Sequence, residues 1–340
     1  MVKKILVVSP AWIGDTVMAQ VLLKLLKQFN SNSIIDVLAP TWNHALFSHM
    51  PEINCVIISP FLHGELALKK RYQLAKKLRS EKYDESIVLP NSFKSALIPF
   101  LANIPVRIGW LGEQRFGLLN KIRFLDKKKY PRMIDRFAAL AFDHSKNIPG
   151  NLPYPKFQIA PEQVNLALKK QNINLLNQKI LALCPGAEFG PSKRWPPEYF
   201  AVIANQKISE GWSVWLFGSK NDSEVANKIQ IKANNQCVNL VGKTDLSEAI
   251  HLLSLANIVV TNDSGLMHVA AALDLPIIAI YGSTSPEFTP PLSHRAIILK
   301  LNLVCQPCFK RVCPLKHHHC MNLLMPDQVM MAMRNLQEPT

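Results

Sequence analysis

A junction at residues 261–268 combines an acid, two small residues and a histidine where a strand is expected to lead into a helix. Its sequence is Thr-Asn-Asp-Ser-Gly-Leu-Met-His, and an apolar run precedes it. Apolar residues at helical spacing follow, which puts Ser264 and Gly265 at a helix N-terminus, where free N–H groups and the dipole attract an anion. His268, one turn later, is placed to donate to that anion. We therefore predict a phosphate site here that includes Asp263, with ordinary N-capping as the alternative.

A lysine in a loop rich in glycine and proline offers a positive charge for the same ligand. Lys193 follows residues 186–191, after an expected strand at 180–184. The carboxyl ends of parallel strands share one edge of a sheet, so Lys193 is expected near Asp263. A cation there would neutralise a departing diphosphate, and no Asp-x-Asp motif suited to a divalent cation occurs on this edge. A solvated surface lysine is the alternative.

Three more acids stand at the ends of expected strands. Asp15 follows the first strand and precedes a helix expected at 16–29; a helix cap is the simpler interpretation, and removal of a proton from an acceptor hydroxyl is the functional one. Asp222 and Glu224 follow the strand expected at 213–217, where either acid could hydrogen-bond a ribose or cap a helix. The pattern does not separate Asp222 from Glu224.

Positive charge is concentrated in the first half of the chain. The net charge is +15, and residues 1–170 carry 25 Lys and Arg against 12 Asp and Glu. This half is expected to face an anionic partner, which charge alone leaves open among nucleic acid, an acidic membrane and a phosphorylated acceptor. The basic run at 69–82 fits a solvated helix face. Candidates for bidentate capture of acceptor phosphate or carboxylate groups are Arg107, Arg115, Arg123 and Arg132.

Alternating strand-like and helical runs predict an α/β chain with two doubly wound parallel sheets. This alternation of strands and helices stops at a Pro-rich connector at 148–155 and resumes with the strand expected at 180–184. We therefore assign residues 1–155 and 156–325 to two Rossmann-like domains and 326–340 to a terminal helix. The first βα turn lacks the G-x-G-x-x-G of dinucleotide binding, so hydride transfer is not expected.

The seven cysteines favour reduced thiols over a disulfide framework. Cys55, Cys184 and Cys237 fall within strands that are expected to be buried. The other four follow the spacing C-x2-C-x4-C-x6-C from 305 to 320, with three histidines before the last, which leaves packed thiols and a structural metal both open. No apolar run approaches the ~20 residues of a membrane span or resembles a secretory signal, so a cytoplasmic protein is expected.

Three of these segments together resemble the lipopolysaccharide core heptosyltransferases of glycosyltransferase family 9. They are PAWIGDT at 10–16, PGAEFGPSKRWP at 185–196 and the junction at 261–268, with CQPCFKR at 305–311 as a further mark. The resemblance spans nearly the whole chain. It implies the GT-B fold, in which two Rossmann-like domains face each other across a cleft, the first binding the acceptor and the second ADP-heptose. It also implies that the terminal helix crosses back to the first domain.

The same resemblance implies roles for residues and an activity. Asp15 would be the general base, Lys193 the basic donor-binding residue, and the junction the pyrophosphate site with Asp263 near the donor sugar. The implied reaction is metal-independent, inverting transfer of the second L-glycero-D-manno-heptose from ADP-heptose to heptosyl-Kdo2-lipid A, at the inner face of the cytoplasmic membrane. Alternatives are transfer of the first or another core heptose, a nucleotide-sugar epimerase of GT-B fold, and nucleic-acid binding, which only charge favours.

Overall fold

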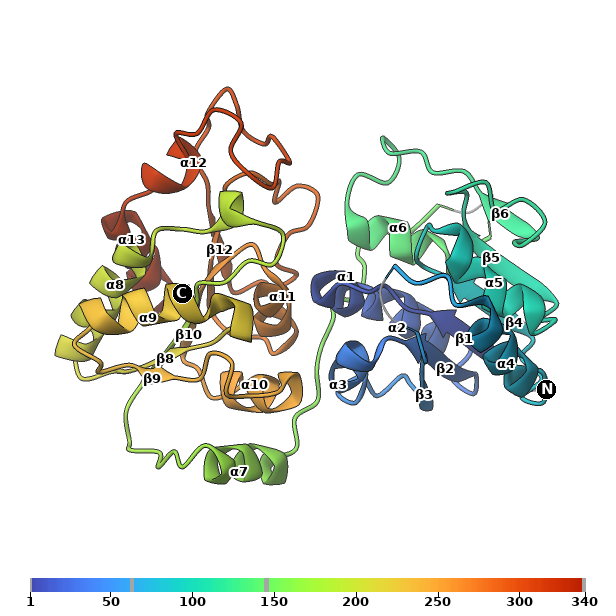
Figure 1. Ribbon diagram of the computed structural model, residues 1–340, viewed down its shortest axis with the longest axis horizontal. Coiled ribbons are helices and arrows are strands. Elements are labelled where there is room, and N and C mark those ends of the chain that lie inside the picture. The colour runs from blue at the N-terminus through green and yellow to red at the C-terminus, as the bar shows by residue number, and fades with distance from the viewer. Residues whose placement is uncertain (1, 62–63, 144–146, 338–340) are drawn as a thin grey trace. The chain divides into compact units, whose positions relative to one another are not determined.

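The computed structural model describes residues 2–61, 64–143 and 147–337. The chain separates into two compact units, Met1–Pro155 and Lys156–Thr340. This division falls at the end of the Pro-rich connector. Each unit contains one parallel β-sheet with helices packed along it (Figure 1). The chain is therefore α/β throughout, as its alternating pattern predicts.

The first unit has a six-stranded parallel sheet in the order β3-β2-β1-β4-β5-β6. Its strands are β1 (Lys4–Val8), β2 (Ile34–Ala39), β3 (Cys55–Ile58), β4 (Glu85–Val88), β5 (Val106–Trp110) and β6 (Lys121–Arg123). The strand order reverses between β1 and β4. In doubly wound sheets, ligands bind beyond the carboxyl ends of the strands at such a reversal.

The second unit repeats this topology in the order β12-β11-β10-β7-β8-β9. Its strands are β7 (Ile180–Cys184), β8 (Ser213–Leu216), β9 (Val238–Asn239), β10 (Ile258–Asn262), β11 (Ile277–Ile280) and β12 (Ala296–Leu299). Here the order reverses between β7 and β10, which pair in parallel with Val260 opposite Leu183. The second possible ligand site therefore lies where these two strands end.

Helices connect the strands in both units. The first unit contains α1 (Ile13–Met18), α2 (Gln20–Phe29), α3 (His44–Phe47), α4 (Leu68–Arg79), α5 (Phe93–Leu101), α6 (Met133–Ala139) and the 3-10 turn η1 (Thr41–Asn43). The second contains α7 (Pro161–Lys170), α8 (Pro197–Ser209), α9 (Ser223–Lys232), α10 (Leu246–Leu253), α11 (Gly265–Ala272), α12 (His319–Asn322), α13 (Pro326–Gln337) and the 3-10 turns η2 (Pro191–Lys193) and η3 (Lys220–Asp222).

The strands of the second sheet are apolar, as expected for a parallel sheet that helices cover on both faces. Strands β7, β10 and β11 are buried along their whole length. Leu183 and Val260 pack in one cluster with Phe200 from α8 and Met333 from α13. Parallel strands buried in this way have near-continuous apolar sequences. That burial fixes the strand ends, from which the candidate site residues project.

The first predicted helix begins earlier than expected and is divided. We expected it at 16–29, whereas α1 starts at Ile13 and a turn at Ala19 separates it from α2. Asp15 thus lies inside the first turn of α1, and Trp12 is the N-cap residue. The prediction that Asp15 stands before the helix as its cap is therefore wrong. Its carboxylate still lies at the positive end of the helix dipole.

The sequence pattern also missed several short elements and misplaced one cysteine. Strand β6 is only three residues long and includes two basic residues, so it carries no strand-like pattern. Strand β12 and helix α7 were not predicted either. Cys55 is exposed, not buried, because β3 is an edge strand of its sheet. Helix α6 ends at Ala139, and residues 144–146 lie outside the described residues.

The described part of the terminal helix belongs to the second unit. Helix α13 packs against α8, β11 and β12, and Val329 and Met333 join the core cluster of that unit. A crossing onto the first unit stays a prediction, and residues 338–340 lie outside the described residues. Among the residues that the structure describes, no helix is long and apolar enough to span a membrane.

Candidate active site

Four loops leave the carboxyl edge of the second sheet side by side. They follow β8, β7, β10 and β11, which are neighbours in the sheet. The loop at 185–196 follows β7, and the junction at 263–265 follows β10. Because the strand order reverses between β7 and β10, these two segments start from the point where such sheets bind ligands. The donor-site residues predicted from sequence therefore come from adjacent strands.

An ion pair joins these two loops. The Lys193 Nζ atom lies 2.6 Å from Asp263 Oδ2, and the exposed fractions of the two side chains are 13% and 5%. Thr284, from the loop after β11, donates its hydroxyl to the same carboxylate oxygen at 2.5 Å. Lys193 Nζ also lies 5.0 Å from the centre of the Phe189 ring. The structure thus confirms that Lys193 lies near Asp263 and shows that the two form a largely buried pair.

The lysine loop is fixed by the end of β10. The Asn262 side chain is fully buried, donates to the Pro185 carbonyl at 2.7 Å and accepts from the Trp195 N–H at 3.1 Å. One side chain therefore ties together both ends of the loop. The Trp195 indole, also fully buried, donates to the Leu324 carbonyl at 2.8 Å. These hydrogen bonds fix the backbone on both sides of Lys193, although Lys193 itself lies in a loop.

The N-terminus of α11 lies beside the ion pair. Ser264 is the N-cap residue with extended backbone, its side chain makes no capping bond, and Gly265 is the first helical residue. The free N–H groups of this turn can receive an anion. His268 is 4% exposed, and its Nδ1 makes no hydrogen bond to the described residues. Burial lowers the pKa of His268 to about 4, so its ring is neutral near pH 7 and can offer only one N–H.

Asp222 lies against the glycine loop on the other side of β7. Its Oδ2 accepts from the N–H and the hydroxyl of Ser219 at 2.9 and 2.8 Å, so it does cap η3. Its Oδ1 is buried and has no hydrogen bond among the described residues, with an Arg194 nitrogen 3.8 Å away. A Cβ atom at Gly186 would overlap this carboxylate. Only glycine therefore lets the loop approach so closely.

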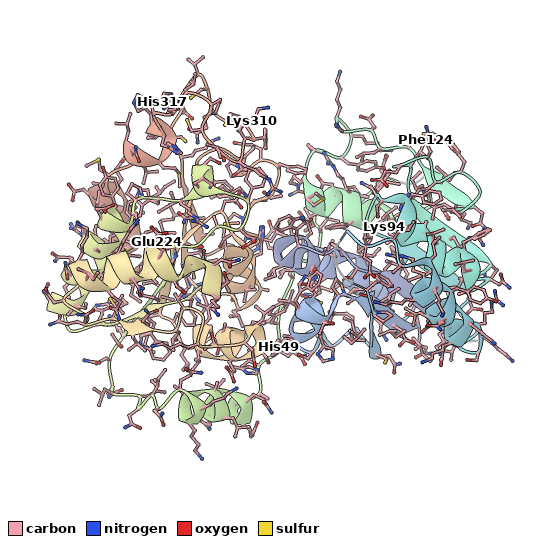
Figure 2. The ribbon with its side chains drawn as sticks, viewed as in Figure 1. His49, Lys94, Phe124, Glu224, Lys310 and His317 are labelled. Atoms are coloured by element: carbon pink, nitrogen blue, oxygen red, sulfur yellow. The ribbon has the colours of Figure 1, made fainter. Side chains whose placement is uncertain are left out.

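Glu224 has a different environment. It lies on α9 (Figure 2), its side chain is 79% exposed, and it pairs with Lys228 at 2.7 Å one turn along the helix. The hydrogen bond from Lys228 lowers the pKa of Glu224. The sequence left Asp222 and Glu224 equivalent. The structure places Asp222 on the rim, where its Oδ1 makes no hydrogen bond to the described residues, and Glu224 on an exposed helix surface.

Asp15 occupies the corresponding edge of the first sheet. It follows β1, beside the reversal between β1 and β4, and is partly exposed. The loop before it is braced by Asn43, whose amide donates to the Pro10 carbonyl at 3.0 Å and to the Thr16 hydroxyl at 2.8 Å. The Trp42 indole donates to the Ala11 carbonyl at 2.9 Å. The first unit therefore holds this carboxylate on a supported turn.

Comparison with known proteins identifies the family. Residues 71–319 match the family model described as glycosyltransferase family 9 (heptosyltransferase). The chain belongs to this family. It is 48% identical over 307 residues to lipopolysaccharide heptosyltransferase 2 of Salmonella typhimurium and 46% identical over 307 residues to the Escherichia coli K12 protein of the same name, and each match covers 88% of both chains.

The fold of this family-9 glycosyltransferase agrees with that of a solved relative. The structure of Escherichia coli ADP-heptose LPS heptosyltransferase II matches it with a TM-score of 0.88 and 40% sequence identity, over 98% of each chain. The family and the GT-B fold class predicted from the sequence are therefore confirmed.

The four arginines predicted to bind the acceptor all have partners within the first unit. Arg115 is fully buried and donates to the carbonyls of Pro90 and Trp110; burial lowers its pKa to about 10. Arg123 is 8% exposed and donates to the Phe142 carbonyl. Both side chains tie loops together, and this burial leaves neither of them accessible to an acceptor.

The other two arginines are partly accessible. Arg107 donates to the carbonyls of Leu118 and Ile104, each at 2.6 Å. Arg132 forms an ion pair with Asp135, with 2.7 Å between Nη2 and Oδ1, and 36% of its side chain is exposed. An acceptor role for Arg107 and Arg132 stays a prediction, and Arg132 is the more accessible of the two.

Sequence reasoning missed Thr284 and Asn262. A run of small hydroxyl residues, Ser283 to Ser285, closely follows β11 and was the available signal for Thr284. Asn262 belonged to the quoted junction, but nothing in the pattern showed that its amide would hold the loop after β7. Both contacts join residues far apart in the chain, so spacing along the sequence could not reveal them.

Proposed function

We propose that this enzyme transfers L-glycero-D-manno-heptose from ADP-heptose to the first heptose of the lipopolysaccharide inner core. The names of the relatives that it matches at 46–48% identity over 88% of the chain support this reaction. The observation that carries this proposal is the set of polar groups at the carboxyl edge, or rim, of the second sheet. There Lys193 and a helix N-terminus supply positive charge, and two buried polar atoms of the same rim, His268 Nδ1 and Asp222 Oδ1, have no hydrogen bond among the described residues. Buried polar atoms in native proteins normally have partners, and a bound ligand can supply them.

In this proposal the diphosphate of ADP-heptose binds at the N-terminus of α11. The N–H groups at Ser264 and Gly265 point toward its oxygens, and neutral His268 donates one further N–H. Lys193 contacts the diphosphate, either giving up its ion pair with Asp263 or keeping it. Asp222 accepts a hydrogen bond from a ribose hydroxyl through Oδ1. Asp263, released from Lys193 in part, lies near the donor sugar.

The chemical step that we propose is a single displacement with inversion. Asp15 takes the proton of the acceptor hydroxyl as its oxygen forms a bond to the anomeric carbon of the donor heptose. The bond from that carbon to the diphosphate oxygen breaks, and its electron pair leaves with ADP. Lys193 and the N–H groups at α11 stabilise the charge that grows on the leaving group. Because these groups supply the positive charge, we propose that transfer needs no divalent cation.

Mass spectrometry of the products tests the function directly. The enzyme is incubated with ADP-heptose and one of two acceptors: Kdo2-lipid A, or the same acceptor with one heptose. We expect a gain of one heptose on the one-heptose acceptor only, with release of ADP. Transfer to Kdo2-lipid A instead would identify the enzyme that adds the first heptose. Conversion of ADP-heptose without any acceptor would identify an epimerase.

The environments of Asp222 and Glu224 give a paired prediction for donor affinity. Asp222→Asn keeps an oxygen to cap η3 but removes the charge that strengthens a hydrogen bond to ribose. We expect the Kd for ADP to rise roughly 5-fold, or about 1 kcal/mol. Glu224→Gln should leave it unchanged, because Glu224 is exposed and its carboxylate is already paired with Lys228. Isothermal titration of ADP into each variant measures this, and an effect of Glu224→Gln alone would reverse the assignment.

We also propose that the first unit associates peripherally with the anionic inner leaflet through α4. Lys69, Lys70, Lys76 and Lys77 are exposed on this helix. Leu68 and Tyr72 on the same helix are also exposed, at 56% and 51%. The buried face carries Leu78, Ala75 and the side chain of Arg71. The outer surface of α4 thus combines lysines with two apolar anchors, a composition suited to a lipid headgroup layer.

Binding to vesicles should therefore be electrostatic and specific to α4. Each interfacial lysine contributes on the order of 1 kcal/mol, so changing the four α4 lysines to Gln should abolish most co-sedimentation with phosphatidylglycerol-containing vesicles at low salt. The matched control changes four exposed lysines of the second unit: Lys169, Lys170, Lys228 and Lys243. The control should bind as wild type does, and high salt should release both. Equal, salt-independent binding by all three proteins would reject the proposal.

A further inference from the structure

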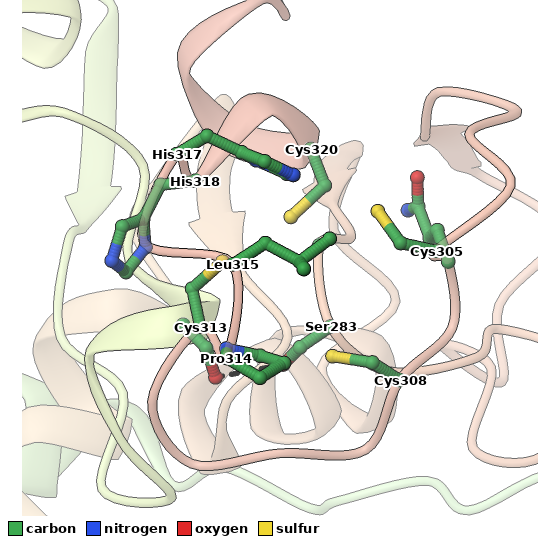
Figure 3. A pocket seen from close by; sticks show the side chains of 12 residues that line it. Ser283, Cys305, Cys308, Cys313, Pro314, Leu315, His317, His318 and Cys320 are labelled. Carbon is green, nitrogen blue, oxygen red and sulfur yellow. Dashed lines mark hydrogen bonds between the residues drawn. The ribbon is translucent and has the colours of Figure 1, made fainter.

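A thiol-rich cavity lies behind the lysine loop of the second unit. Four cysteines of residues 303–320 line it: Cys305, Cys308, Cys313 and Cys320. Figure 3 shows their sulfur atoms around one common space, with Leu315 among them. All four are free thiols. No Lys, Arg, Asp or Glu side chain of the described residues lines this cavity.

The four thiols face one another across this cavity (Figure 3). Packed apolar thiols would not need four sulfur atoms to converge on one space.

We propose that these four cysteines bind one divalent cation that prefers thiolate ligands, Zn²⁺ or Fe²⁺. Four cysteine sulfurs are a common ligand set for structural sites of both metals. Each sulfur gives up its proton to solvent as its bond to the metal forms. In the described residues, no three such side chains are already arranged to hold a metal ion. Binding therefore requires the thiols to draw together and Leu315 to move out from among them.

The segment that carries these cysteines also supports the lysine loop. The hydroxyl of Ser192 donates to the Lys310 carbonyl at 2.5 Å, and its N–H donates to the Arg311 carbonyl at 3.2 Å. A Cβ atom at Gly190 would overlap the same Arg311 oxygen. Ser192 directly precedes Lys193. A metal that ties Cys308 to Cys313 would therefore fix the backbone on which Lys193 rests.

Metal content of the purified full-length protein tests the proposal without any substrate. The protein is prepared without oxygen or chelator and analysed by elemental mass spectrometry. We expect about one Zn or Fe per chain, and about four fewer reactive thiols than after chelation. Loading the chelated protein with Co²⁺ should give the intense charge-transfer absorption of a cobalt–thiolate site. Stoichiometric metal without thiolate absorption would overturn the assignment of these ligands.

Variants separate this site from other thiols and from the neighbouring histidines. Cys308→Ser and Cys313→Ser should lose the metal, whereas the exposed Cys55→Ser should keep it. The double variant His317→Ala, His318→Ala should also keep it, because we assign only sulfur ligands. Wild-type protein that binds no Zn²⁺, Fe²⁺ or Co²⁺, or whose four cysteines form disulfides under these conditions, would refute the proposal. These wild-type measurements do not depend on how the variants fold.

A second readout tests the link to the lysine loop. Limited proteolysis should cut within residues 186–194 faster after the metal is removed, with at least ~10-fold faster cleavage if the loop is released from its support. Cleavage elsewhere in the second unit should change less. An unchanged rate at this loop, with metal binding established, would show that the metal does not position Lys193. None of these outcomes depends on the proposed transfer reaction.

Discussion

Replacing Asp15 with Asn is expected to lower turnover by at least ~100-fold while leaving ADP-heptose binding nearly intact. Asn has the same shape but cannot take the proton of the acceptor hydroxyl, and the loss corresponds to about 2.7 kcal/mol in the barrier. Folding should change little, because Asp15 lies in the first turn of α1, where losing a favourable charge costs about 0.3–1 kcal/mol. Steady-state kinetics with a one-heptose acceptor, beside thermal melting and ADP titration, measure all three quantities.

A matched carboxylate distinguishes this effect from a general loss of charge. Glu81 is half-exposed, pairs with Lys4 at 2.6 Å and also belongs to the first unit. Glu81→Gln should turn over as wild type does. Near-normal turnover of Asp15→Asn would remove Asp15 from the mechanism.

Replacing Lys193 with Met is expected to weaken ADP binding and to reduce turnover by about 100-fold or more. Its charge acts on the diphosphate both before and during departure, so both quantities fall. The variant should also unfold more easily, because it leaves the Asp263 carboxylate, 5% exposed, without its cation. Removing one partner of a buried pair costs about 3 kcal/mol. Thermal melting and single-turnover kinetics measure the two effects separately.

A double variant separates these two roles of Lys193. In Lys193→Met with Asp263→Asn, no charge is left unpaired, and the Asn side chain can still accept from Thr284. Stability should return toward wild type while turnover stays low. If turnover returned together with stability, Lys193 would serve only to neutralise Asp263. The double-mutant cycle reports their coupling energy directly.

The order of apolar and polar residues was sufficient to predict the two sheets and the edge on which the site lies. Residues 180–184 and 258–261 are apolar enough to be buried strands in any α/β arrangement, so the residues that follow them had to lie at strand ends. This local signal alone predicts that Lys193 and Asp263 lie together. It failed for β6, whose three residues include two lysine or arginine side chains, and for the helix at Asp15, whose start depends on the turn that precedes it.

Only the tertiary structure decided which polar residues are free to act. Arg115 and Arg132 look alike in sequence, but the fold buries the first completely and leaves the second partly exposed. Asp222 and Glu224 are two residues apart, yet only Asp222 faces the glycine loop. Cys55 is exposed because its strand is at an edge, and four other cysteines converge because a long segment folds back on itself. Burial and pairing depend on contacts between residues far apart in the chain, and such contacts are fixed only when the sheets and loops pack.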